Sequence, residues 1–194
     1  MDDKEIKKML VLYTQRAYDR GLVGGTGGNL SARLNDGLHM VITPSGLSLK
    51  DTTLDNLVTV NVETHQHQAP EGFIPSKEFH FHADIYCLRP EVCAVAHVHP
   101  PYCTAFAVKR RDIPCVTDAA FKQPPIPRVT FAPSGTQELR NNVAEAIKAN
   151  PGCHVLLLEA HGIAALGADV VKAYDLADLT EEMARIGYMA EMLE

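Results

Sequence analysis

Short apolar segments that end at glycine or proline alternate with amphipathic segments along this chain, and this alternation constrains the fold more than any other feature. Two apolar segments, 30–34 and 38–43, flank Asn35-Asp36-Gly37, a sequence typical of a β-hairpin turn. We expect further strands near 57–62, 93–98, 129–132, 154–158 and 163–166, and helices over about 3–19, 75–88, 102–108, 136–149 and 169–193. The hairpins and the interspersed helices together predict an α/β fold in which helices cover the faces of a largely antiparallel sheet.

The size and charge of the chain limit the function classes open to it. Its 194 residues, 46% of them hydrophobic, suit one domain, 1–194, with a full apolar core. The 18 Lys and Arg against 24 Asp and Glu give a net charge of −6, which argues against a nucleic-acid partner because phosphate contacts need clustered basic residues. No apolar run approaches the roughly 18 residues that cross a bilayer, so we expect no membrane partner.

The N-terminal residues and the cysteines predict the cellular compartment. The start, Met1-Asp2-Asp3, is acidic and lacks the basic and apolar regions of a signal peptide. The five cysteines are an odd number and form no Cys-x-x-Cys pair, a pattern that favours reduced thiols over a disulfide framework. We therefore expect a cytoplasmic protein.

Histidine stands out in the composition, with nine copies in a chain that has no tryptophan. Three His-x-His pairs occur, at 65/67, 80/82 and 97/99. Residues i and i+2 share one face of a strand about 7 Å apart, whereas on a helix they point roughly 200° apart. The 80/82 pair falls in an expected helix and the 65/67 pair in a polar segment typical of an exposed turn. Only His97 and His99 end an apolar strand, so this pair is the favoured metal chelate.

A metal centre needs further ligands. His161 follows the apolar strand at 155–158 and precedes Gly162, which permits a close backbone approach. Glu78, expected in the first turn of its helix, is a candidate carboxylate for a His₃–carboxylate set. From these patterns alone, His161 also fits a hydrogen-bonded core histidine, and the 97/99 pair fits a structural role as well as a metal site.

Six sequence blocks carry a resemblance to a known family. They are Gly28-Asn29-Leu30-Ser31-Ala32-Arg33, Ile42-Thr43-Pro44-Ser45-Gly46, Pro75-Ser76-Lys77-Glu78, Tyr86-Cys87-Leu88-Arg89-Pro90, Ala94-Val95-Ala96-His97-Val98-His99 and Leu157-Leu158-Glu159-Ala160-His161-Gly162. In their order and spacing the chain resembles the class II aldolase/adducin family, and within it the enzymes that cleave L-fuculose 1-phosphate. The resemblance implies a three-layer α/β/α fold and a homotetramer with active sites at the subunit interfaces.

The resemblance also assigns roles to individual residues. It implies one Zn²⁺ per subunit, held by His97, His99 and His161, although another divalent transition metal would suit the same ligands. Glu78 is expected to be the catalytic carboxylate and to contact the metal in the empty enzyme.

The positions that match the family's phosphate-binding residues are Asn29, Ser45, Gly46 and Ser76. Their hydroxyl, amide and backbone N–H groups suit a phosphate without much net positive charge. Lys77 stands where the fuculose enzymes have a serine, and it would add a point charge for a phosphate or a carboxylate.

The resemblance implies a lyase that cleaves a keto-sugar phosphate to dihydroxyacetone phosphate and an aldehyde through a metal-stabilised enediolate. Lys77 makes a decarboxylase of a 3-oxo-tetronate phosphate-like acid the first alternative, ahead of dehydratase and epimerase relatives. A non-catalytic, adducin-like interaction module is a further alternative, which the complete ligand set disfavours. The proton-donating tyrosine of the fuculose enzymes has no match; Asp118 lies near its position, and Tyr188 is another candidate for the general acid.

Overall fold

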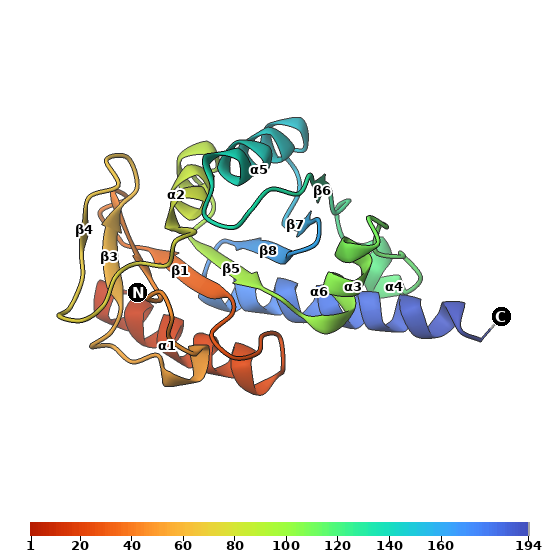
Figure 1. Ribbon diagram of the computed structural model, residues 1–194, viewed down its shortest axis with the longest axis horizontal. Coiled ribbons are helices and arrows are strands. Elements are labelled where there is room, and N and C mark those ends of the chain that lie inside the picture. Colours follow the sequence, from red (N-terminus) through yellow and green to blue (C-terminus); the bar gives the residue numbers. More distant parts are fainter. Residues whose placement is uncertain (194) are drawn as a thin grey trace.

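The computed structural model describes residues 1–193, in which one eight-stranded sheet lies between two layers of helices (Figure 1). The strands are β1 (Asn29–Arg33), β2 (His39–Ile42), β3 (Val58–Asn61), β4 (His67–Gln68), β5 (Ala94–Val98), β6 (Arg128–Val129), β7 (Val155–Leu158) and β8 (Gly162–Gly167). Their order across the sheet is β4-β3-β2-β1-β5-β8-β7-β6, and every neighbouring pair is antiparallel except β6 and β7. The predicted fold class, α/β/α with a largely antiparallel sheet, is confirmed.

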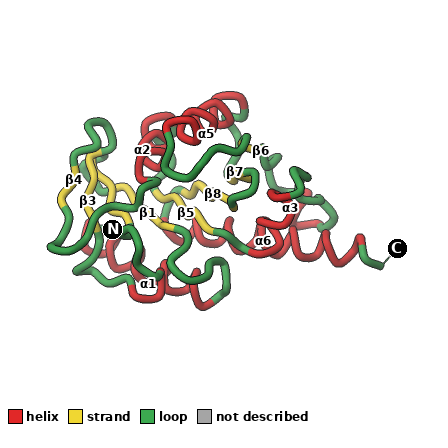
Figure 2. Tube along the Cα trace, in the orientation of Figure 1, coloured by secondary structure: helices red, strands yellow, loops and turns green. Residues whose placement is uncertain are grey.

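The helices form the two outer layers (Figure 2). They are α1 (Asp3–Asp19), α2 (Phe79–Leu88), α3 (Pro101–Val108), the short α4 (Asp118–Phe121), α5 (Gln137–Ala149) and α6 (Val170–Glu191), with a 3₁₀ turn, η1, at Leu49–Asp51. Helices α1, α3 and α6 pack their buried residues against one face of the sheet, and α2 and α5 pack against the other. None of the helices within 1–193 is long and apolar enough to cross a membrane.

Strand β5 carries side chains to both cores. Ala94, Ala96 and Val98 join the core under α1, α3 and α6, whereas Val95 joins the core under α2 and α5. Because successive strand residues alternate between the two faces, His97 lies on the face covered by α2 and α5. Its neighbour across the sheet is Asn29 on β1.

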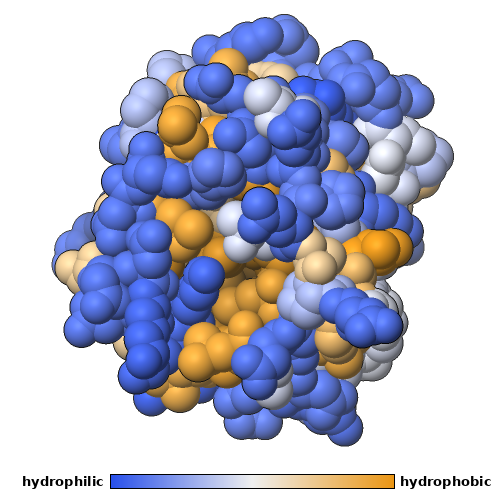
Figure 3. Space-filling view, turned by 90° about the vertical axis from the view of Figure 1, so that its left-hand side faces the viewer, coloured by the Kyte–Doolittle hydropathy of each residue, from blue (hydrophilic) through white to orange (hydrophobic). Residues whose placement is uncertain are grey.

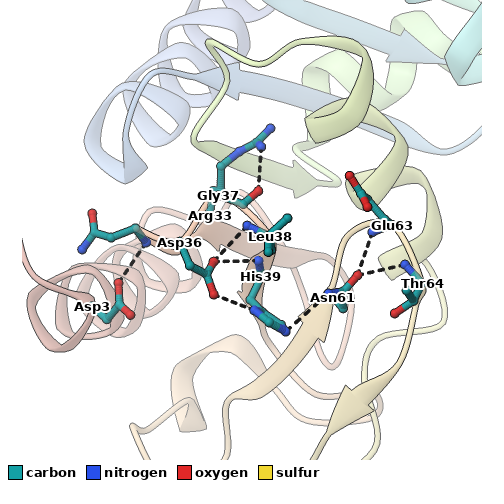
Figure 4. A network of polar contacts seen from close by, with 10 residues as sticks. Asp3, Arg33, Asp36, Gly37, Leu38, His39, Asn61, Glu63 and Thr64 are labelled. Carbon is teal, nitrogen blue, oxygen red and sulfur yellow. Dashed lines mark hydrogen bonds and ion pairs between the residues drawn. The ribbon is translucent and has the colours of Figure 1, made fainter.

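The predicted hairpin turn is present between β1 and β2. The Asp36 carboxylate accepts hydrogen bonds from the backbone N–H groups of Leu38 and His39, each at 2.9 Å, and contacts the His39 ring (Figure 4). Gly37 has φ +70, a left-handed conformation that glycine adopts without strain. The helix expected over about 3–19 also forms, and Asp2 and Glu5 make a capping box at its start.

Three local expectations differ from the structure. The helix expected from 75 begins at Phe79, because Pro75 forms an isolated β-bridge with Pro44 and residues 77–78 form a turn. Glu78 therefore precedes the helix instead of lying in its first turn. The strand expected near 129–132 is reduced to β6, because the Phe131 N–H bonds to the Glu159 side chain at 3.4 Å. His67 lies in the two-residue strand β4, where an exposed turn was expected.

An apolar hollow lies at one end of the molecule. The side of the protein shown in Figure 3 is hollowed and lined by hydrophobic residues, with hydrophilic residues around the rim. A cavity of about 390 Å³ lies where the start of α1 meets the start of α6, and Met1, Ile6, Met9 and Val170 are among the residues that line it. Within residues 1–193, the one group of three metal-ligating side chains lies elsewhere.

Candidate metal centre

Three histidines from two parts of the sheet converge at one point. His97 lies on β5, His99 follows this strand, and His161 lies in the turn between β7 and β8. One ring nitrogen from each lies within 4.8 Å of the others, and this is the one such His, Cys, Asp or Glu group of three found in residues 1–193. The His97 and His99 Nε2 atoms are 3.1 Å apart.

The backbone around His161 is shaped for this convergence. Ala160 has φ +52, a left-handed conformation that is uncommon for a residue other than glycine. Gly162 follows His161, and a Cβ atom at Gly162 would lie 2.4 Å from the Val98 carbonyl oxygen and 2.7 Å from the His99 ring. Glycine thus lets β8 approach the end of β5 closely enough for His161 to meet His97 and His99.

Glu78 completes the cluster. Its two carboxylate oxygens lie 3.2 Å from His97 Nε2 and 3.4 Å from His161 Nε2. The Asn29 side-chain amide and the Ser134 hydroxyl each donate a hydrogen bond to the carboxylate, both at 2.9 Å. The residue is 4% exposed, so these contacts hold a buried carboxylate in one orientation.

The charges of the cluster are set by burial and by mutual contact. Burial alone would raise the pKa of the Glu78 carboxyl, but His97, His161 and Asn29 outweigh it and hold that pKa far below its usual range. Burial lowers the pKa of His99 to about 3 and that of His161 to about 4, reinforced in both by the charge of His97. Burial opposes protonation of His97, yet contact with Glu78 raises its pKa overall. The result is one carboxylate facing imidazoles of which two are neutral.

This donor set fits a divalent transition metal. The His97 Nδ1–H donates a hydrogen bond to the Ile163 carbonyl oxygen at 2.9 Å, so Nε2 is the ring nitrogen that faces the cluster. Three imidazole nitrogens and one carboxylate are a ligand set typical of zinc and of neighbouring first-row metals. His97, His99, His161 and Glu78 are therefore the residues that could hold the ion.

A cavity of about 340 Å³ opens beside the cluster, and Glu78, His99 and His161 line it. Every residue predicted to bind substrate or phosphate also lines this cavity: Asn29, Ser45, Gly46, Ser76 and Lys77. The structure thus brings the predicted site residues together around one space, while their roles in binding stay predictions.

Two features of the site were not anticipated in the sequence. Ser134 donates to Glu78 from the loop before α5, and nothing in its sequence neighbourhood, Pro133-Ser134-Gly135, distinguishes it from an ordinary turn. Asn29 is predicted to bind phosphate, and the structure adds a contact that the sequence did not predict, the hydrogen bond that its amide donates to Glu78. Pairing of β1 with β5, which sets Asn29 opposite His97, is the structural signal that links it to the cluster.

The two candidate general acids lie away from the cavity. Asp118 begins α4, where it is exposed and paired with Lys122. Tyr188 lies on α6, is 46% exposed, and packs on Tyr102 with ring centroids 5.7 Å apart. Neither residue lines the cavity of its own chain.

Comparison with known proteins agrees with this geometry. Residues 8–188 match the family described as Class II Aldolase and Adducin N-terminal domain. The chain belongs to the class II aldolase/adducin family.

Relatives within this family are similar over most of their length. The L-fuculose phosphate aldolase of Methanococcus maripaludis is 34% identical over 178 residues, which cover 91% of this chain and 93% of the relative. The L-fuculose phosphate aldolase of Escherichia coli K12 is 37% identical over 168 residues, which cover 86% of this chain and 74% of the relative.

Solved class II aldolase structures share the fold. An L-fuculose 1-phosphate aldolase superposes with a TM-score of 0.89 at 28% identity, covering 100% of this chain and 89% of the other. The L-fuculose-1-phosphate aldolase from Thermus thermophilus superposes with a TM-score of 0.81 at 25% identity, covering 97% and 95%. Together, family and relatives identify the chain as an enzyme, a lyase of the class II aldolase type.

Proposed function

We propose that this class II aldolase is zinc-dependent and cleaves a phosphorylated keto sugar, similar to L-fuculose 1-phosphate, to dihydroxyacetone phosphate and an aldehyde. The observation that carries the proposal is the position of Glu78, a buried carboxylate that lies against His97 and His161 and lines the same cavity as the proposed phosphate ligands. The relatives named L-fuculose phosphate aldolase support the substrate class.

In this proposal, His97, His99, His161 and Glu78 hold one zinc ion in each subunit. Bound there, zinc supplies Lewis acidity that polarises the carbonyl and hydroxyl oxygens of the substrate. The histidines contribute neutral nitrogen donors, since the low pKa values of His99 and His161 keep both rings unprotonated at neutral pH.

Glu78 is the proposed base. Its low pKa keeps the carboxylate ionised before substrate binds. Displaced from the metal, the carboxylate would accept the proton of a substrate hydroxyl as the carbon–carbon bond breaks. The Asn29 amide and the Ser134 hydroxyl hold the carboxylate where it faces the cavity.

Other residues that line the cavity form the proposed phosphate subsite. Ser45, Gly46 and Ser76 offer hydroxyl and backbone N–H groups, and Gly46 has φ +74 in an exposed turn. Lys77 adds a cation beside them. Contacts of this kind fix the substrate in register with the base, and this positioning lowers the entropic part of the barrier.

A specific observation favours a second candidate, decarboxylation of a 3-oxo-tetronate phosphate-like acid. Lys77 immediately precedes Glu78 and lines the same cavity, so its ammonium group would be available to a carboxylate on the substrate. With a carboxylate in place of the departing aldehyde, the same bond cleavage would release CO₂.

A product assay separates these candidates. Zinc-loaded protein is given L-fuculose 1-phosphate or a 3-oxo-tetronate phosphate, and dihydroxyacetone phosphate and CO₂ are measured. We expect dihydroxyacetone phosphate from the first substrate; predominant CO₂ release from the second, abolished in Lys77→Met, would establish the decarboxylase instead. Absence of both products and of bound metal would favour an adducin-like interaction module.

We also propose a homotetramer with active sites at the subunit interfaces, in the cytoplasm. The end of α6 and the residues that follow it support an interface, because Tyr188, Met189, Met192 and Leu193 are all exposed there. Light scattering should then give four times the 21.2 kDa of one chain, and Met192→Glu should lower that mass. A wild-type mass equal to that of one chain would contradict the tetramer.

A further inference from the structure

The structure brings together two histidines that belong to different His-x-His pairs. His65 lies just before β4, and His80 lies in the first turn of α2. Their Nδ1 atoms are 3.2 Å apart. Neither residue belongs to the His97, His99 and His161 cluster, and the sequence separation of 15 residues gave no reason to pair them.

The spacing of these two nitrogens matches that of the metal centre. His97 and His99 Nε2 atoms are 3.1 Å apart, against 3.2 Å here. With Zn–N bonds of about 2.0–2.1 Å, nitrogens at 3.2 Å subtend an angle of about 100° at the ion, close to tetrahedral. Both rings are partly exposed, so an ion can reach them and water can supply the remaining ligands.

Backbone and aromatic contacts hold the His65 ring in place. His65 has φ +63, a left-handed conformation that few residues other than glycine adopt, so the position is specified by its surroundings. The preceding turn is fixed by the Asn61 side chain, which accepts hydrogen bonds from Glu63 and Thr64 (Figure 4). The Phe79 ring packs against both imidazoles, with centroids 5.8 Å from His65 and 3.9 Å from His80.

The charged residues that act on the pair are Asp84 and Arg140. Asp84, one helical turn beyond His80, forms an ion pair with Arg140 on α5, and its Oδ1 accepts a hydrogen bond from Arg140 Nη2 at 2.7 Å. Burial, together with the charge of Arg140, which outweighs that of Asp84, lowers the pKa of both His65 and His80, so neither ring has to lose a proton at neutral pH to bind a metal. No hydrogen bond or ion pair to a carboxylate competes for His65 Nδ1 or His80 Nδ1 among the described residues.

We propose that His65 and His80 form a second, surface metal site that binds a divalent transition metal such as Zn²⁺ through two imidazole nitrogens. An ion there would join the β3–β4 turn to the start of α2, two residues from Glu78. The site does not depend on the proposed aldolase reaction, because it uses neither the cavity nor the three histidines of the metal centre.

Zinc binding to metal-free protein, measured by equilibrium dialysis, tests the site. We expect His65→Asn to bind one equivalent of Zn²⁺ fewer per chain than the wild type, and His80→Gln to show the same loss. Asparagine is chosen at 65 because it tolerates the left-handed backbone. His67→Asn is the matched control, two residues along on β4, and should bind as much zinc as the wild type.

The same measurement separates this site from the metal centre. His97→Ala/His99→Ala should lose a different equivalent and keep the one that depends on His65. Crystals soaked in zinc should show anomalous scattering within about 2.0–2.1 Å of both Nδ1 atoms. Unchanged zinc binding in His65→Asn and His80→Gln, or no anomalous peak between the rings, would overturn the proposal.

Discussion

Glu78 shows how a buried carboxylate is kept ionised by its neighbours. It is almost fully buried, which by itself favours the protonated acid, yet it lies against His97 and His161 and accepts two hydrogen bonds. These contacts lower its pKa. A carboxylate held in this way is ionised and available as a metal ligand.

Replacing Glu78 should separate its role as base from the integrity of the fold. We expect Glu78→Gln to lower turnover by about 10²–10⁴-fold, since general-base catalysis contributes on that order. Steady-state rates of zinc-loaded protein, with metal content measured in the same samples, give the answer. Ser134→Ala is the matched control; it removes one hydrogen bond to the carboxylate but keeps the charge, so its loss should be much smaller. Turnover within tenfold of wild type in Glu78→Gln would exclude Glu78 as the base.

His82 is a second buried titratable group, on the inner face of α2. It is 0% exposed, and its Nδ1 lies 2.7 Å from the Ser31 hydroxyl. Burial lowers the pKa of His82 to about 3, against 6.5 for an ordinary histidine. The folded protein therefore keeps this ring neutral under conditions in which the unfolded chain protonates it.

This difference predicts a pH dependence of stability. As the pH falls below 6.5, His82 becomes protonated in the unfolded chain, whereas in the folded chain it stays neutral down to about pH 3. Proton uptake stabilises the unfolded chain, so the free energy of unfolding falls with pH. The contribution is about 1.4 kcal/mol per pH unit. The free energy of unfolding of metal-free protein is measured by urea unfolding between pH 6 and pH 4. Its slope against pH counts the protons taken up on unfolding, and we expect about one proton fewer in His82→Gln than in wild type. An equal slope in His82→Gln and wild type would contradict the burial argument.

At the scale of elements, the site depends on how closely the start of β1 meets the end of β5. Gly28 precedes β1 and has φ +72. A Cβ atom there would lie 2.6 Å from Val23 and 2.9 Å from the His97 carbonyl oxygen. Glycine is required here for two reasons: the backbone is left-handed, and there is no space for a Cβ atom beside the metal ligand His97.

Gly28→Ala should therefore destabilise the protein and weaken the metal centre. We expect a loss of about 2–4 kcal/mol in the free energy of unfolding, from left-handed strain and overpacking together. Gly24→Ala is the control in the same loop, because a Cβ atom there meets nothing within 4 Å. Denaturant unfolding and zinc affinity of both variants test this; equal stability of the two would show that the loop relaxes without cost.

Element boundaries show what the sequence could and could not predict. Periodicity and turn residues placed α1 and the β1–β2 hairpin correctly, because these elements carry their own local signals. The start of α2 was missed because Pro75 pairs with Pro44, a contact between segments far apart in the sequence. The meeting of His65 with His80 was missed for the same reason, since strand and helix rules treat each His-x-His pair by itself.

At the scale of the whole molecule, the candidate site is assembled where several elements end. Asn29 starts β1, Glu78 precedes α2, His99 follows β5 and His161 lies between β7 and β8. Residues at or just after the end of an apolar strand could be singled out from sequence, as His97 and His161 were. Ser134 could not, because a serine in an irregular loop has no pattern that reveals what it contacts.

Metal-dependent release of dihydroxyacetone phosphate tests the central claim most directly. Metal-free protein is titrated with zinc, and product release from L-fuculose 1-phosphate is measured at each addition for wild type and for His161→Asn. We expect release in the wild type to rise with zinc bound at the metal centre, up to one equivalent there, and His161→Asn to lose that equivalent and most of the activity. Product release that is independent of zinc, or unchanged in His161→Asn, would contradict a catalytic metal held by His97, His99, His161 and Glu78.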